Sequence, residues 1–201
     1  MREPIKLFSF ILLALCFFGC QNKKKGINEI KNTAKEYNYS REFIKYDLGN
    51  NITEDLEIYI NKNNDTLSFQ KIIYNRNIID SSKSRFYKLN LNRDEKLNIL
   101  NGKLTYCYDS IKDGKLVDFT FSAVSKQNDK TKIVDFKNFD SKRKFLEFSF
   151  GNNNDTLIGA IFAQHAKDTI ENGEKKVRIR EILLPVDNYS KTNNPFVEIK
   201  L

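Results

Sequence analysis

The amino-acid sequence predicts an antiparallel all-β fold of the β-sandwich kind for residues 41–201. Apolar and polar residues alternate in segments 56–60, 104–108, 117–123 and 146–150, which is the pattern of a strand with one buried face. Asp-Gly and Asn-Gly pairs at 113–114 and 172–173 favour tight hairpin turns. The chain also has 16 Phe and 9 Tyr but only three Pro. This composition suits a protein of about ten to twelve strands.

Residues 1–19 precede this region and have the pattern of an export signal. Basic residues near Met1 are followed by a run of twelve residues, 7–18, that is apolar except for Ser9. A run of this length is too short to span a membrane, which takes roughly 20 residues. Gly19 and Cys20 close the run, and the chain turns polar at Gln21.

This ending resembles the signal of bacterial lipoproteins. Gly19 is the small residue expected before the cleavage point, although Phe17 and Phe18 stand where Leu and a small residue are usual. Such looser signals look like those of flavobacterial outer-membrane lipoproteins. The resemblance implies that residues 1–19 are removed and that Cys20 becomes a lipidated N-terminus, anchored in the outer membrane.

Residues 20–40 are expected to form a tether that follows the lipid. A short helix is predicted over 27–37, because Ile27, Ile30, Ala34 and Tyr37 recur at helical spacing. Lysines occupy positions 23–25. Each lysine close to anionic lipid headgroups contributes about 1 kcal/mol to membrane attraction. In the lipoproteins that the signal resembles, surface export favours acidic residues after the cysteine, so we expect the periplasmic side rather than the cell surface.

The net charge argues against a nucleic-acid partner. The whole chain carries +8, and removal of Arg2, Glu3 and Lys6 with the signal leaves +7. Outside the lysines at 23–25, basic residues are interleaved with acidic ones and form no long basic block. A solvated surface of mixed charge is the expected result.

An internal similarity organises the predicted strands. Residues 56–67 align without a gap with residues 146–157, and seven of the twelve positions are identical. We interpret this as a duplicated strand–turn–strand unit, with repeat units of about 41–130 and 131–201. Convergence of two hairpins on a common sequence remains the alternative. Segment 157–163 is apolar on both faces, which predicts a central strand, and Gly159 predicts close packing against it.

The residues that usually carry catalysis are sparse. Cys16 leaves with the signal and Cys20 takes the lipid, so Cys107 is alone and is expected to be a half-buried packing residue. His165 is the only histidine, and we expect it to be partly exposed at the end of a strand. We therefore expect no catalytic residue, no metal site and no cofactor. The series Asn61, Asn63 and Asp65 could ligate calcium, but turn chemistry explains it better.

One triplet recurs more often than composition predicts. An Asp, a hydroxyl residue and an aliphatic residue follow one another four times, with the hydroxyls at Thr66, Ser110, Thr156 and Thr169. The triplet is similar to the O-glycosylation acceptor of exported proteins in Bacteroidota-type bacteria, which implies sugar at these positions. The alternative is that such a triplet leads from a turn into a strand.

The functional prediction is a lipid-anchored, non-enzymatic cell-envelope protein with a binding or assembly role. Its partners are expected to be the membrane, through the lipid on Cys20, and an envelope protein or polymer. Tyr59, Tyr74, Tyr87 and Tyr108 could offer aromatic platforms for a polymer, although their alternation favours packing. An alternative is an inhibitor or immunity-type lipoprotein that blocks a toxin or hydrolase through an exposed strand edge. A hydrolase is the least expected reading.

Overall fold

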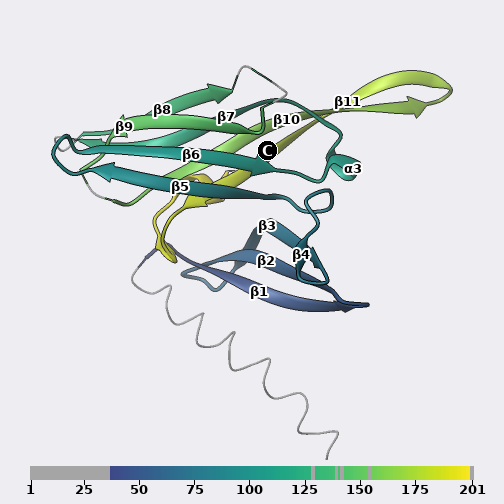
Figure 1. Ribbon diagram of the computed structural model, residues 1–201, viewed down its shortest axis with the longest axis horizontal. Helices are drawn as coiled ribbons and strands as arrows, with labels where there is room; N and C mark the ends of the chain where they lie inside the picture. Colours follow the sequence, from purple (N-terminus) through teal and green to yellow (C-terminus); the bar gives the residue numbers. More distant parts are fainter. Residues whose placement is uncertain (1–36, 128–129, 139, 141–142, 154, 200–201) are drawn as a thin grey trace, which may run out of the picture.

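The computed structural model describes residues 37–127, 130–138, 140, 143–153 and 155–199, and within them the chain is almost entirely antiparallel β-sheet. This confirms the predicted fold class (Figure 1). The elements are β1 (Tyr39–Gly49), β2 (Ile52–Asn61), β3 (Thr66–Asn75), β4 (Ile78–Ile79), β5 (Phe86–Asp94), β6 (Ile99–Cys107), α3 (Ser110–Asp113), β7 (Lys115–Gln127), β8 (Lys130–Asn138), β9 (Phe145–Gly151), β10 (Ile158–Glu171), β11 (Glu174–Asp187), β12 (Lys191–Thr192) and the 3-10 helix η1 (Pro195–Glu198).

The strands form three sheets. Sheet A has the order β12-β1-β2-β3-β4, sheet B the order β5-β6-β9, and sheet C the order β11-β10-β7-β8. Sheets B and C stack into a sandwich, sheet A lies along one side of it, and the β10–β11 hairpin projects beyond the body (Figure 1). Each strand pair is antiparallel. The sandwich-like arrangement is as predicted.

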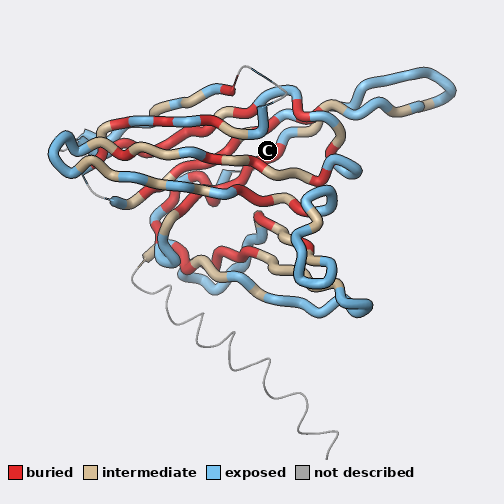
Figure 2. Tube along the Cα trace, in the orientation of Figure 1, coloured by how far each residue is buried: buried red, intermediate tan, exposed pale blue. Residues whose placement is uncertain are grey.

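The main hydrophobic core lies between sheets B and C. Leu104 and Phe148 of sheet B meet Phe121 and Ile161 of sheet C in one buried cluster. Figure 2 shows this burial concentrated in the stacked strands, whereas the projecting hairpin is exposed. Phe69 of β3 packs against this cluster and against two smaller ones. Phe69 is thus one of the side chains that connect sheet A to the sandwich.

Strand β10 is the predicted central strand, and the structure confirms it. It lies between β7 and β11, and Gly159 pairs with Ala123 on one side and Val186 on the other. A Cβ atom on Gly159 would lie 2.5 Å from the Ser122 carbonyl oxygen, so only glycine fits. The prediction for His165 was wrong. Because the Tyr106 and Tyr108 rings pack against His165, the imidazole is fully buried rather than partly exposed.

Turn chemistry explains most of the Asn and Gly clusters. The Asn61 side-chain oxygen accepts hydrogen bonds from the backbone N–H groups of Asn63 (2.9 Å) and Asp65 (2.8 Å), which supports the turn interpretation over calcium. Asn172 and Gly173 have positive φ angles of 55° and 81° and join β10 to β11 as predicted. Asp113 and Gly114 form no hairpin, because Asp113 ends α3 and Gly114 caps it.

The two similar sequence segments do not form equivalent units. Residues 56–67 fold into the β2–β3 hairpin of sheet A. Residues 146–157 instead leave β9 in sheet B and enter β10 in sheet C, which are not paired with each other. The predicted boundary at residue 130 falls between β7 and β8, which pair along their length. Sequence similarity between the segments therefore preserves a strand but not the hairpin.

The N-terminal predictions concern residues before the first described strand. The signal at 1–19, Cys20, and the helix predicted over 27–37, except Tyr37, lie outside the described residues. In the part of the chain from Tyr37 onward that the structure describes, no helix has the length and apolar character needed to cross a membrane.

Candidate binding cleft

A cleft of about 710 Å³ lies beside the point where the chain enters β1. Five segments surround it: the region of Tyr37, the end of β7, the start of β8, the β9–β10 connection, and the stretch from the end of β11 to η1. This volume is within the usual range for small-ligand sites. The cleft is therefore the leading candidate for a binding site.

Asparagine side chains hold the loops that form the cleft. The Asn152 amide donates to the Thr156 carbonyl oxygen over 2.8 Å. Asn188 accepts from the Leu157 N–H (2.8 Å) and donates to the Asp155 carbonyl oxygen (2.6 Å). These bonds satisfy backbone groups that the chain leaves unpaired as it passes from sheet B to sheet C. Side-chain hydrogen bonds thus hold the described residues of these loops.

The carboxylate in the cleft wall, Asp187, is committed to the protein. One of its oxygens accepts from the Thr192 hydroxyl, and the other accepts from Tyr59 (2.8 Å) and from the Asn194 amide (2.9 Å). Burial raises the pKa of Asp187, and these hydrogen bonds oppose the rise. Both oxygens have protein donors, so the group anchors the wall and offers little to a ligand.

Two lysines give the cleft its charge. Lys126 and Lys191 line it, and the Lys191 ammonium lies 5.5 Å from the centroid of the Tyr37 ring. Tyr189 also lines the cleft, and its hydroxyl donates to the Asp155 carboxylate. With Asp187 enclosed, the lining is positive and carries two aromatic rings. Such a surface can attract an anion and pack against an apolar or sugar face.

A second buried polar network adjoins the cleft and joins sheet A to the sandwich. Glu57 is fully buried, and one of its oxygens accepts from Arg41 (2.5 Å) and from the Gln70 amide (2.7 Å). The Tyr87 hydroxyl accepts from the Asp187 N–H over 3.1 Å, and Arg41 reaches the same hydroxyl. Burial raises the pKa of Glu57, and the Arg41 guanidinium opposes the rise. Because the groups are mutually satisfied, we assign this network a structural role.

His165 belongs to a separate buried cluster away from the cleft lining. Its Nε2 lies 3.1 Å from the Tyr106 hydroxyl oxygen, while its buried Nδ1 has no hydrogen-bond partner among the described residues. Burial lowers the pKa of His165 to about 4, so the imidazole is neutral at pH 7. Nearby, the buried Asp113 carboxylate accepts from Arg85 (2.6 Å) and Arg180 (2.8 Å).

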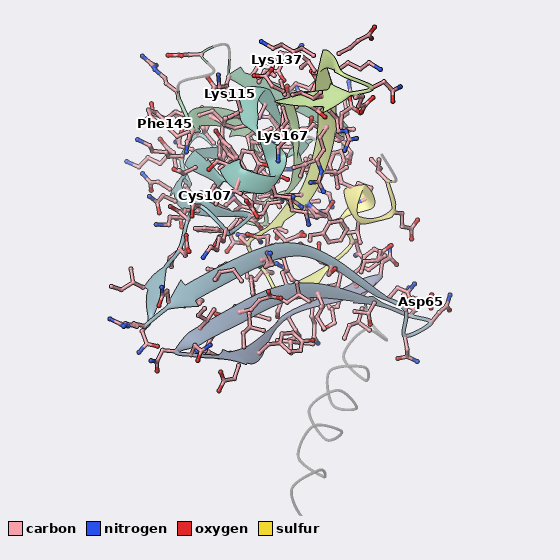
Figure 3. All side chains as sticks on the ribbon, turned by 90° about the vertical axis from the view of Figure 1, so that its right-hand side faces the viewer. Asp65, Cys107, Lys115, Lys137, Phe145 and Lys167 are labelled. Atoms are coloured by element: carbon pink, nitrogen blue, oxygen red, sulfur yellow. The ribbon has the colours of Figure 1, made fainter. Side chains whose placement is uncertain are left out.

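The residues predicted as modification sites are spread over the molecule. Thr66 begins β3 and Ser110 begins α3, and both are exposed. Thr156 is half-buried in the cleft lining, and Thr169 is half-buried in the projecting part of β10. In Figure 3, Asp65, which precedes Thr66, stands at the far tip of sheet A. The four hydroxyls thus form no common site.

Other predicted residues take packing positions. Cys107 ends β6 and is half-buried, as expected, and burial raises the pKa of its thiol. Tyr59 and Tyr87 are buried, so they are not platforms for a polymer. Across the residues from Tyr37 to Ile199 that the structure describes, no cluster of three His, Cys, Asp or Glu side chains could hold a metal ion.

Sequence reasoning missed the cleft residues. Tyr37, Lys126, Tyr189 and Lys191 come from segments with no shared motif or spacing. Only the Asn-rich stretch 151–154 marked one of the loops in advance. Comparison of the chain with protein-family models, with curated proteins and with solved structures finds no match.

Proposed function

We propose that this chain is a lipid-anchored, non-enzymatic envelope protein that binds an anionic glycan of the envelope in the cleft. The observation that carries the proposal is the pair of lysines in a preformed hollow whose carboxylate, Asp187, already has donors on both oxygens. Positive charge from two lysines in one hollow favours a carboxylated or phosphorylated ligand. The two tyrosines and the amide-rich loops suit the faces and hydroxyls of sugars.

A binding role is supported over catalysis by where the titratable groups lie. His165 is buried and neutral, and it does not line the cleft. Asp187 accepts hydrogen bonds from Tyr59, Thr192 and Asn194, so both of its oxygens are occupied and it is not set up as a general base. The cleft lies beside Tyr37, where the tether from Cys20 reaches the fold. A ligand bound there would therefore be held near the membrane anchor.

The proposal is tested by charge reversal in the cleft. The full-length lipidated protein is titrated in detergent with acidic uronic-acid oligomers and with neutral glucose oligomers of equal length. We expect the acidic oligomers to bind, and the double variant Lys126→Glu/Lys191→Glu to weaken binding by about tenfold or more. The matched control is Lys88→Glu/Lys103→Glu, which changes the same charge on exposed positions of sheet B.

Two results would contradict the proposal. Equal loss of binding in the control pair would show a diffuse charge effect with no role for the cleft. Shortened oligomers, detected by mass spectrometry after incubation, would show that the protein is an enzyme.

A further inference from the structure

The β10–β11 hairpin projects from the body as an arm, defined here as residues 166–180 (Figure 1). Its cross-strand pairs place Ala166, Asp168 and Ile170 opposite Ile179, Val177 and Lys175, so these six residues share one face. Ile170, Val177 and Ile179 are 72%, 60% and 57% exposed. Three large aliphatic side chains are thus exposed together on one face of a protruding hairpin. Exposed apolar groups that cluster in this way mark interaction sites.

The outer edge of the arm is open. Strand β11 ends sheet C, and no other strand within the described ranges pairs with its outer side. In a two-residue hairpin, the pair next to the turn, here Glu171 and Glu174, is hydrogen-bonded, and bonded pairs then alternate along the ladder. The N–H and C=O groups of Lys175, Val177 and Ile179 therefore point outward. Pro185 falls in the same outward series, where its missing N–H breaks no bond to β10.

Charge decides what can pair with this edge. Residues 175–180 contain four basic residues and no acidic one. Two copies of β11 could pair in an antiparallel way about a two-fold axis. If the axis passes through Val177, Lys176 of each copy lies opposite Arg178 of the other. If it passes through Arg178, the two copies of Arg178 lie opposite each other. Like charges directly opposite are destabilising. The edge thus disfavours self-association and leaves its backbone groups available to a different chain.

We propose that the outer edge of β11 binds an extended strand of a partner protein in which acidic and aliphatic residues alternate. The backbone groups of Lys175, Val177 and Ile179 supply the ladder. The aliphatic side chains of the partner lie beside Val177 and Ile179 on one face. Its acidic side chains lie beside Lys176 and Arg178 on the other, where the two side chains are 44% and 71% exposed. Strand addition takes its affinity from such a ladder and its specificity from alternating side chains.

Glu171 does not remove this preference. Its carboxylate lies 3.5 Å from the Lys176 ammonium and 3.4 Å from the Arg178 guanidinium. One carboxylate shared by two exposed cations leaves positive charge on that face, and pairs at such exposure are weak. The edge of β11 is also separate from the cleft. Its partner is therefore a different ligand, and this proposal does not depend on ligand binding in the cleft.

The test uses the full-length lipidated protein in detergent and the labelled peptide acetyl-(Val-Glu)4-amide, followed by fluorescence anisotropy. We expect saturable binding, and we expect acetyl-(Val-Lys)4-amide to bind at least about tenfold more weakly. Val177→Pro removes one outward N–H without touching the β10 ladder, and it should weaken binding about tenfold. Ile170→Pro is the matched control, because Ile170 faces outward from the opposite edge of the arm.

A charge swap gives the sharper criterion. The double variant Lys176→Glu/Arg178→Glu should lose affinity for the glutamate peptide and gain affinity for the lysine peptide. Circular dichroism spectra of all variants should match that of the parent. The proposal is overturned if the charge swap does not exchange the peptides, or if Ile170→Pro weakens binding as much as Val177→Pro. Concentration-dependent dimerisation that Val177→Pro abolishes would assign the edge to a second copy and would also overturn it.

Discussion

At the scale of single residues, the buried polar groups determine how this β-rich chain responds to its surroundings. Glu57, Asp113 and Asp187 are buried carboxyl groups, and each has hydrogen-bond donors from side chains of other segments. Removal of one partner from such a pair leaves a charge without compensation and costs about 3–5 kcal/mol. His165 differs from them, because one of its ring nitrogens has no partner in the described structure.

The first prediction concerns acid stability. Burial lowers the pKa of His165 from 6.5 to about 4, so the unfolded chain takes up a proton in this window and the folded chain does not. Stability should therefore fall as the pH is lowered from about 6.5 to 4, by a total of about 3 kcal/mol for this group, and His165 should contribute no further change below that. Urea unfolding, followed by circular dichroism at pH 7 and pH 4.5, measures this change in the free energy of unfolding.

The control for this prediction is His165→Gln, which keeps an acceptor for Tyr106 and cannot titrate. Glu57, Asp187 and the other carboxyl groups are the same in both proteins, so the difference between the two pH profiles isolates the imidazole. Parallel profiles for the parent and the variant would refute the assignment.

The second prediction concerns the Asp-hydroxyl-aliphatic triplets. Thr66 and Ser110 are exposed, and Thr156 and Thr169 are half-buried. When the protein is made in a bacterium with the corresponding glycosylation system, we expect sugar at these four hydroxyls. Each replacement by Ala should remove one mass increment from the intact mature protein. Thr131→Ala serves as control, because Thr131 is exposed but follows a lysine. A mass equal to polypeptide plus lipid would leave the triplets as turn chemistry.

At the scale of elements, β10 has two different environments along one strand. Its first half lies between β7 and β11 in sheet C, and its second half leaves the body as the arm. The β7 ladder ends at the pair Ala166 and Lys115, so from there onward β10 has only β11 as a neighbour. Beyond the end of β7, the β10–β11 hairpin is therefore a two-stranded ribbon that is exposed to solvent. Two glycines near its ends experience opposite environments.

The third prediction compares these glycines. Gly159→Ala should destabilise the protein by about 3 kcal/mol, since the new Cβ would lie 2.5 Å from the Ser122 carbonyl oxygen and 2.7 Å from the Phe121 ring. Gly173→Ala meets no atom within 4 Å but keeps a φ of 81°, so it should cost about 1 kcal/mol. Thermal and urea unfolding measure both. Equal losses would mean that packing around β10 relaxes more than this close contact allows.

At the scale of the whole molecule, the cleft and the arm are separate surfaces. The cleft lies beside Tyr37, and the arm projects from the sandwich (Figure 1). The polar network around Glu57 and Asp187 connects sheet A to the sandwich, so the cleft wall and sheet A are coupled. We interpret the cleft and the arm as two binding surfaces of one protein.

The fourth prediction concerns the anchor. Cys20→Ala should abolish lipid labelling and either release the protein from membranes or leave an unprocessed precursor, because lipidation requires the thiol. Incorporation of labelled palmitate and membrane fractionation are the measurements. Unchanged labelling and fractionation would exclude Cys20 as the lipid site. Protection of the protein when protease is added to intact cells is expected for the periplasmic side, with a periplasmic marker as control.

The sequence by itself determined the all-β class, the central strand and most of the turns. Period-two burial at Leu146, Phe148 and Phe150 is a local property of a strand, and Asn172-Gly173 suits positive φ angles wherever it occurs. Only the tertiary structure decided which strands meet. It sent two similar segments to different sheets, buried His165, and brought Lys126 and Lys191 to one cleft. Such contacts depend on sheet order and on long-range packing, which no spacing within a segment records.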